Sequence, residues 1–104
     1  MSPAIQGKLA ELPDVCGRRS VRRLAIFGSA ASDRFDRHKS DVDVLVEFKP
    51  MPPSEHANAY FGLQEDLQEL FGVPVDLVEP GPIRNPYFRQ AVEQTQVVLY
   101  ESTA

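Results

Sequence analysis

The sequence predicts a compact α/β (α+β) domain in which helices alternate with three or four β-strands. Short apolar runs rich in Val, Ile and Leu predict the strands, and longer segments with apolar residues at helical spacing predict the helices. Pro and Gly residues stand at the ends of both kinds of segment. With 104 residues, of which 42% are hydrophobic and 25% charged, we expect one packed domain over residues 1–104.

The first half of the chain predicts one or two helices followed by two strands. Apolar residues up to Leu12 fall on one helical face, and Pro13 either ends that helix or begins a short second one. The apolar run from Val21 to Phe27 predicts a strand that enters the core, and Asp41 to Phe48 predicts a second strand.

The second half predicts a long helix, a strand, a short helix and a last strand. Ser54 can cap the long helix, and Gly72 with the proline that follows can end it. Residues 73–80 predict the third strand, residues 87–94 a short helix and residues 96–101 the last strand. The large apolar residues of the long helix that we expect in the core are Tyr60, Phe61, Leu63 and Leu67.

Charge and cysteine content narrow the functional classes. The formal net charge of -4 argues against a general nucleic-acid binder, so no direct nucleic-acid binding is expected. Seven of the eleven Lys and Arg residues lie within 18–39, and nine of the fifteen acids lie within 41–79. This distribution suits a site that holds phosphates and metal ions together, or two differently charged solvated faces. The single cysteine, Cys16, excludes an intramolecular disulfide, and without a signal peptide or a membrane span we expect a cytoplasmic chain that contacts no membrane.

Two carboxylates stand on alternate positions of the second predicted strand. Side chains alternate across a strand, so Asp41 and Asp43 lie on the face opposite the apolar residues. Carboxylates that close repel each other, and a divalent cation between them removes the conflict. Oxygen ligands of this kind suit Mg²⁺. The residues that we expect on the core face are Val42, Val44, Val46 and Phe48.

The third predicted strand repeats this arrangement. In "VPVDLVEP", Val75 and Leu77 share one face and Asp76 takes the other. If the two strands are neighbours in one sheet, Asp76 can join Asp41 and Asp43, and three carboxylates can hold two metal ions for displacement at phosphorus. Taken alone, "DVD" is often a solvated strand edge or a structural cation site, and the aspartate of "VDLV" is more often a polar residue at a strand end.

The turn after the first strand predicts a phosphate site. Backbone N–H groups converge where a strand turns into a helix, and Gly28 lets a phosphate approach the chain closely. Ser29 offers a hydroxyl and a backbone N–H. A Gly-Ser pair by itself is usually only a turn, so the phosphate site depends on its combination with the aspartates.

The order of these motifs resembles a known family. "GS", a spacer of eleven residues and "DVD" resemble the signature of the DNA polymerase beta-type nucleotidyltransferase superfamily. More narrowly, "RRLAIFGSA", "SDVDVLVEF", "VDLVEP" and "VVLYE" resemble the minimal nucleotidyltransferases (MNT), the antitoxins of MNT–HEPN toxin–antitoxin pairs. The resemblance covers roughly residues 21–101.

The resemblance implies a polymerase beta-type fold, with a small mixed sheet flanked by helices, and a metal-dependent transfer of AMP from ATP. Mg²⁺, as two ions, would be held at Asp41, Asp43 and Asp76, which are also the implied catalytic residues. The nucleotide would be held at Gly28 and Ser29. The acceptor implied by the resemblance is a tyrosine hydroxyl of a partner HEPN RNase toxin, in a hetero-oligomer that silences the toxin.

One departure from the family pattern affects nucleotide binding. Relatives commonly continue "GSxARG", whereas this chain has Ser32 and Asp33 at the last two positions. The loss of that arginine either passes its role to a following base, Arg34, Arg37 or Lys39, or weakens nucleotide binding; of these, Arg34 and Lys39 are the predicted nucleotide-binding residues. Two other functions stay open: a non-catalytic antitoxin that neutralises its toxin by binding, and a small-molecule nucleotidyltransferase. The second usually needs another domain for its acceptor.

Overall fold

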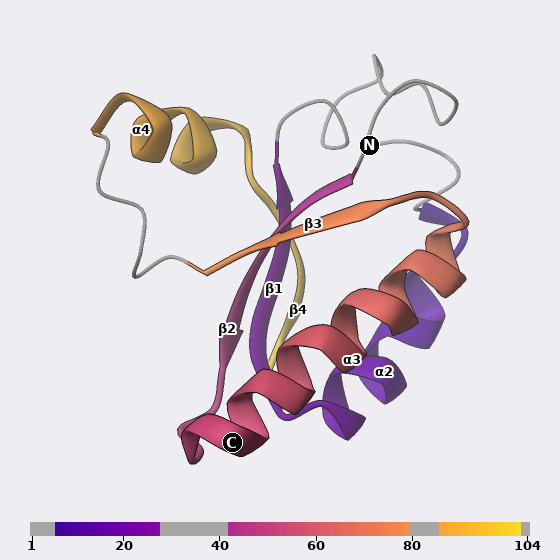
Figure 1. The fold of residues 1–104 in the computed structure, drawn as a ribbon. Helices are drawn as coiled ribbons and strands as arrows, with labels where there is room; N and C mark the ends of the chain where they lie inside the picture. The colour runs from indigo at the N-terminus through magenta and orange to yellow at the C-terminus, as the bar shows by residue number, and fades with distance from the viewer. Residues whose placement is uncertain (1–5, 28–41, 80–85, 103–104) are drawn as a thin grey trace.

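The computed structural model describes residues 6–27, 42–79 and 86–102 of the chain. The described helices and strands, in chain order, are η1 (Leu9–Glu11), α2 (Leu12–Arg18), β1 (Val21–Phe27), β2 (Val42–Phe48), α3 (Pro53–Phe71), β3 (Val75–Val78), α4 (Pro86–Thr95) and β4 (Val97–Glu101). The strands form one sheet in the order β3-β2-β1-β4 (Figure 1). β2 and β3 run parallel, whereas β1 is antiparallel to both of its neighbours. The prediction of an α+β domain with a mixed sheet is confirmed.

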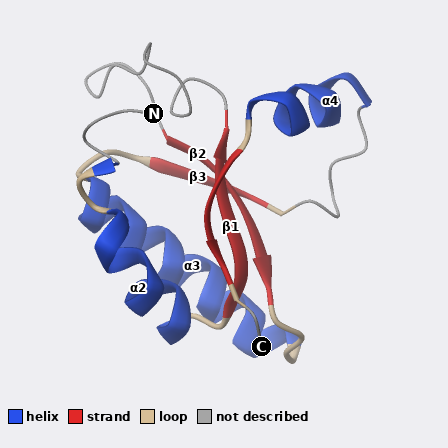
Figure 2. Cartoon of the chain, turned by 180° about the vertical axis from the view of Figure 1, so that it is seen from behind, coloured by secondary structure: helices blue, strands red, loops and turns tan. Residues whose placement is uncertain are grey.

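The two faces of the sheet are covered differently. α2 and α3 lie side by side over one face, which we call the α2–α3 face, and α4 lies over the other, the α4 face (Figures 1 and 2). The α2–α3 face holds the main apolar cluster, because the valines of β2 alternate onto it as predicted. The strand residues buried there are Val21, Leu24, Ile26, Val42, Val44, Val46, Val75 and Leu77. A smaller cluster on the α4 face consists of Ala25, Phe27, Leu45 and Val92.

The start of the chain resolves the two alternatives at Pro13. A short 3-10 turn, η1, leads directly into α2, and Pro13 occupies the first turn of α2. Proline suits that position because its missing N–H would have no helical partner there. Pro13 therefore lies at the start of a second helix, which ends at Arg18.

The boundaries of α3 correct one prediction and confirm another. The helix begins at Pro53 with Pro52 as its N-cap, and no side chain makes a capping hydrogen bond. The predicted cap, Ser54, is already inside the first turn, because Pro53 holds the preceding residue in an extended conformation and itself suits the first helical position. Gly72 ends the helix as predicted, with a left-handed φ of 72° and an N–H that donates to the Gln68 carbonyl at 2.9 Å.

The packing of α3 corrects the predicted core. Its buried stripe runs at a spacing of four residues through Ala59, Leu63, Leu67 and Phe71. Phe61 lies two positions from the nearest members of this stripe, which places it on the opposite side of the helix, and 63% of its surface is exposed. Tyr60 is half-buried at the edge of the stripe. Among residues 6–27, 42–79 and 86–102, every helix is too short or too polar to cross a membrane.

Candidate active site

Two aspartates lie directly beside each other on neighbouring parallel strands. Asp43 of β2 pairs in register with Asp76 of β3, between the pairs Val42–Val75 and Val44–Leu77. Paired residues of adjacent strands have Cα atoms about 4.8 Å apart and side chains on the same face. The prediction that Asp76 faces away from the core is confirmed, since Val75 and Leu77 are 2% and 7% exposed and Asp76 is exposed.

The row of aspartates continues into β1. Phe27, the last residue of β1, pairs with Asp43, so Phe27, Asp43 and Asp76 form one row across three strands. Gly28, the first residue of the predicted phosphate turn, follows Phe27 directly in the sequence. The remaining predicted site residues lie outside the described residues and stay predictions: Gly28, Ser29, Arg34, Lys39 and Asp41.

The aspartate pair lies beside a small cluster of apolar side chains. Leu45 is two residues from Asp43 on the same face of β2, and it packs with Phe27 and with Val92 of α4. Asp43 is half-buried at the edge of this cluster, whereas Asp76 on the outer strand is exposed. The two carboxylates thus differ in solvent access, and the more buried one lies at the centre of the row.

The donor set fits a divalent cation. Two carboxylates on one face of adjacent strands supply oxygen ligands at a spacing that a Mg²⁺ ion can bridge. Within the described ranges, no group of three or more His, Cys, Asp or Glu side chains is close enough to hold a metal. The predicted site of three carboxylates therefore requires Asp41, which precedes β2 by one residue.

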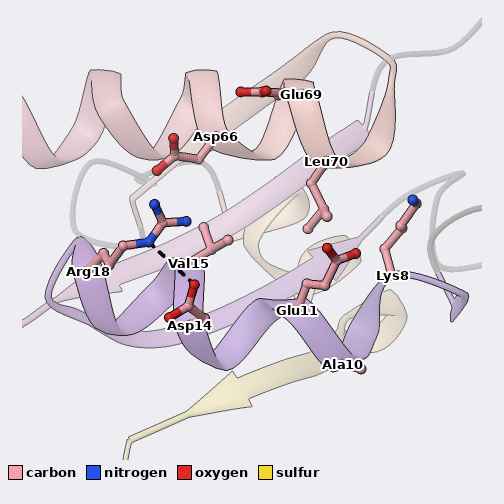
Figure 3. A pocket seen from close by; sticks show the side chains of 9 residues that line it. All are labelled: Lys8, Ala10, Glu11, Asp14, Val15, Arg18, Asp66, Glu69 and Leu70. Atoms are coloured by element: carbon pink, nitrogen blue, oxygen red, sulfur yellow. Dashed lines mark ion pairs between the residues drawn. The ribbon is translucent and has the colours of Figure 1, made fainter.

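One hollow of the described surface lies away from the aspartates. It is formed between η1, α2 and α3, on the side of the sheet opposite the aspartates (Figure 3). Several of its charged side chains already have partners: Arg18 pairs with Asp14 at 3.6 Å, and Asp66 pairs with Arg19 at 2.7 Å. This hollow is a groove between two helices at the rim of the core, and it holds none of the predicted site residues.

A set of polar contacts between α3 and β3 was not predicted from the sequence. Tyr60, predicted to be core, donates its hydroxyl hydrogen to the Leu77 carbonyl at 2.7 Å. Gln64 and Gln68 both bond the backbone of Val75, and neither was among the predicted functional residues. Their spacing of four residues, next to the buried stripe, is the signal in the sequence that could have indicated a shared partner.

Comparison with known proteins identifies the family. The model of the family described as "Nucleotidyltransferase domain" matches residues 9–99. The chain belongs to this nucleotidyltransferase family. It is 42% identical over 79 residues to "Putative protein adenylyltransferase MJ0128" of Methanocaldococcus jannaschii, covering 76% of each chain.

Solved structures agree with this assignment. A chain described as "Structure of putative minimal nucleotidyltransferase" is 29% identical with a TM-score of 0.66, over 89% of this chain and 90% of that one. A structure of a tri-AMPylated Shewanella oneidensis HEPN toxin in complex with MNT antitoxin has a TM-score of 0.61 at 17% identity, over 93% of this chain and 72% of the matched one. This second likeness shows the shared fold. The predicted membership in the minimal nucleotidyltransferases and their fold is confirmed.

Proposed function

We propose that this nucleotidyltransferase transfers AMP from ATP to a tyrosine hydroxyl of a partner HEPN-type RNase toxin, as the antitoxin of the pair. The observation that carries the proposal is the register pairing of Asp43 with Asp76, on one face and directly beside the end of β1. Support comes from the relative named as a protein adenylyltransferase and from the related fold found with an AMPylated HEPN toxin.

The carboxylates would hold Mg²⁺, as two ions, with Asp43 and Asp76 completed by Asp41. Bound there, Mg²⁺ would neutralise charge on the triphosphate and would lower the pKa of the attacking hydroxyl. Asp43, at the centre of the row and partly shielded from water, would be a ligand of both ions. Asp76, exposed on the outer strand, would lie on the side of the incoming acceptor.

The chain's own residues then direct a displacement at the α-phosphorus of ATP. The tyrosine oxygen forms a bond to this phosphorus, the bond to the bridging oxygen breaks, and pyrophosphate leaves. Asp76 accepts the proton of the hydroxyl. Gly28 and Ser29 would offer N–H groups to the phosphates directly after β1, and Arg34 and Lys39 would compensate charge on the triphosphate.

The variant Asp76→Asn tests this proposal. It should lower single-turnover transfer of labelled AMP to the purified partner by ~10²-fold or more, the low end for loss of a positioned base. Binding of ATP with Mg²⁺ should stay within a few-fold of the wild type, and a pull-down should still recover the partner. The fold should be retained, because Asp76 points away from the core.

Glu47→Gln is the matched control. Glu47 lies on the same face of β2 as Asp43 but four residues away, roughly 13 Å along the strand at ~3.3 Å per residue. It pairs with Arg23 at 3.9 Å. Transfer by this variant should equal that of the wild type. Wild-type transfer by Asp76→Asn would refute the assigned carboxylates, and neutralisation of the toxin without any transfer would establish the non-catalytic antitoxin instead.

A further inference from the structure

Three side chains of α3 bond the backbone of β3 on either side of Asp76. Tyr60 Oη donates to the Leu77 carbonyl at 2.7 Å, and Gln64 Nε2 donates to the Val75 carbonyl at 2.9 Å. The Val75 N–H donates to Gln68 Oε1 at 3.1 Å. The three side chains follow at intervals of four residues, so they line one side of the helix along the strand. They contact the peptide groups of the residues immediately before and after Asp76.

β2 holds the same strand from its other side. The Val42 N–H donates to the Pro74 carbonyl at 2.9 Å. This bond shows which residues of β3 direct their backbone groups to β2. In a parallel ladder alternate residues direct both backbone groups to the neighbour, so Asp76 bonds β2 while Val75 and Leu77 turn their groups outward. The outward groups would form an open sheet edge, and α3 bonds three of them: the N–H and the carbonyl of Val75 and the carbonyl of Leu77. The backbone of β3 around Asp76 is thus hydrogen-bonded to β2 on one side and to side chains of α3 on the other.

We propose that Gln64, Gln68 and Tyr60 are positioning residues that fix Asp76 against Asp43 for nucleotidyl transfer. This inference rests on the proposed function of Asp76. β3 is an edge strand of four residues, and a shift of its register by one residue would turn Asp76 to the core face. The bonds from α3 hold the register from the side on which none of the described strands pairs with β3. Residues of α3 therefore control the catalytic geometry although none of them faces the aspartates.

The backbone fixes how each glutamine amide is oriented. Gln68 accepts from an N–H, so its oxygen faces Val75, whereas Gln64 donates to a carbonyl, so its nitrogen faces Val75. A carboxylate can accept but cannot donate. Replacement of Gln68 by Glu therefore preserves the hydrogen bond from the Val75 N–H. Replacement of Gln64 by Glu instead places a carboxylate next to the Val75 carbonyl, where no hydrogen bond can form. The two variants add the same charge one helical turn apart and form a matched pair.

The experiment compares Gln64→Glu and Gln68→Glu in single-turnover AMP transfer at saturating ATP, below the unfolding temperature of both. Gln64→Glu should lose ~10- to 100-fold in transfer rate, the scale expected when a reacting group is misplaced by about 1 Å. Gln68→Glu should stay within a few-fold of the wild type. ATP affinity should change little in either variant. Tyr60→Phe, which removes only the hydroxyl, should lose rate in the same direction as Gln64→Glu.

Two further variants separate positioning from stability and from the proposed function. Val15→Ala in α2 destabilises the core away from β3, and as a folded protein it should transfer at the wild-type rate. Equal rates for Gln64→Glu and Gln68→Glu, beside an inactive Asp76→Asn, would overturn the positioning role and leave the proposed function intact. A rate loss in Val15→Ala as large as in Gln64→Glu would make the effect one of stability and would also overturn it. Wild-type transfer by Asp76→Asn would remove both proposals.

Discussion

The two faces of the sheet differ in what the same strands contribute to each. On the α2–α3 face, β1, β2 and β3 present apolar residues that pack with two helices into a cluster of fifteen buried residues. On the α4 face, alternate positions of β1 and β2 form, together with Val92 of α4, a cluster of four buried residues among those that the structure describes, next to Asp43 and Asp76. The alternation of side chains along a strand allows one face to supply stability while the other carries carboxylates.

The difference also shows how carboxylates can be kept on a central strand. Asp43 lies on β2, which has a neighbour on each side, and apolar side chains cover only part of its face. Full burial of both aspartates would cost several kcal/mol for each charge. The α4 face is covered next to the aspartates, at Leu45, and Asp76 on the outer strand stays exposed. The smaller core on this face is thus compatible with charge beside it.

The first prediction tests the comparison directly with the same substitution on each face. Leu67→Ala, at a fully buried position of α3, should lower the free energy of unfolding by about 3–5 kcal/mol, because the cavity is surrounded on all sides. Leu45→Ala, on the α4 face, should cost about 2 kcal/mol, because its small cluster can collapse more readily. Urea denaturation of both variants measures the two costs. Equal losses would mean that the faces contribute alike to stability.

The second prediction concerns a polar contact at the rim of the α2–α3 face. Arg19 follows α2 and reaches α3, where its guanidinium pairs with Asp66 at 2.7 Å and lies against Gly62. The hydrogen bond to Asp66 raises the pKa of Arg19. A Cβ at position 62 would displace the guanidinium, although alanine in a helix interior gains about 1 kcal/mol over glycine.

A double-mutant cycle measures this contact. Gly62→Ala should stabilise the Arg19→Ala variant by up to about 1 kcal/mol and should stabilise the wild type less, or destabilise it. The difference between the two backgrounds is the coupling between Gly62 and Arg19. An identical effect of Gly62→Ala in both backgrounds, measured by urea denaturation, would show that the guanidinium does not need this space.

The third prediction uses Cys16 to test how completely water is excluded from the core on the α2–α3 face. Cys16 is fully buried there, as expected for a small apolar residue, and burial raises the pKa of its thiol to about 12. The unfolded chain loses the thiol proton near pH 9, before the folded one does, so the folded state loses stability as the pH rises above 9. Below pH 9 both states keep the proton and stability does not depend on it.

The size of this effect follows from the two pKa values. Between pH 9 and pH 10, the free energy of unfolding should fall by about 1 kcal/mol more in the wild type than in Cys16→Ala. Chemical denaturation at both pH values, in the two proteins, isolates the contribution of the thiol from that of the other titrating groups. Parallel decreases in the two proteins would show that water reaches the thiol on this face.

The sequence by itself determined the strand faces and the family. The alternation in "VDVLVEF" and "VDLV" placed Asp43 and Asp76 opposite the valines, because side-chain direction in a strand depends only on the order of neighbouring residues. The motifs from residue 21 to 101 indicated a minimal nucleotidyltransferase, and the family match over residues 9–99 agrees. The start of α3 at Pro53 could also have been predicted from the sequence, since a proline restricts the conformation of the residue before it.

Only the tertiary structure decided which distant residues meet. Asp43 and Asp76 are 33 positions apart in the chain, and their pairing depends on the parallel register of β2 and β3, which no local pattern specifies. The exposure of Phe61 and the bonds from Tyr60, Gln64 and Gln68 depend on how α3 is rotated against the sheet. Helical spacing shows which residues share a side, but the partner on that side is set by packing between segments far apart in the sequence.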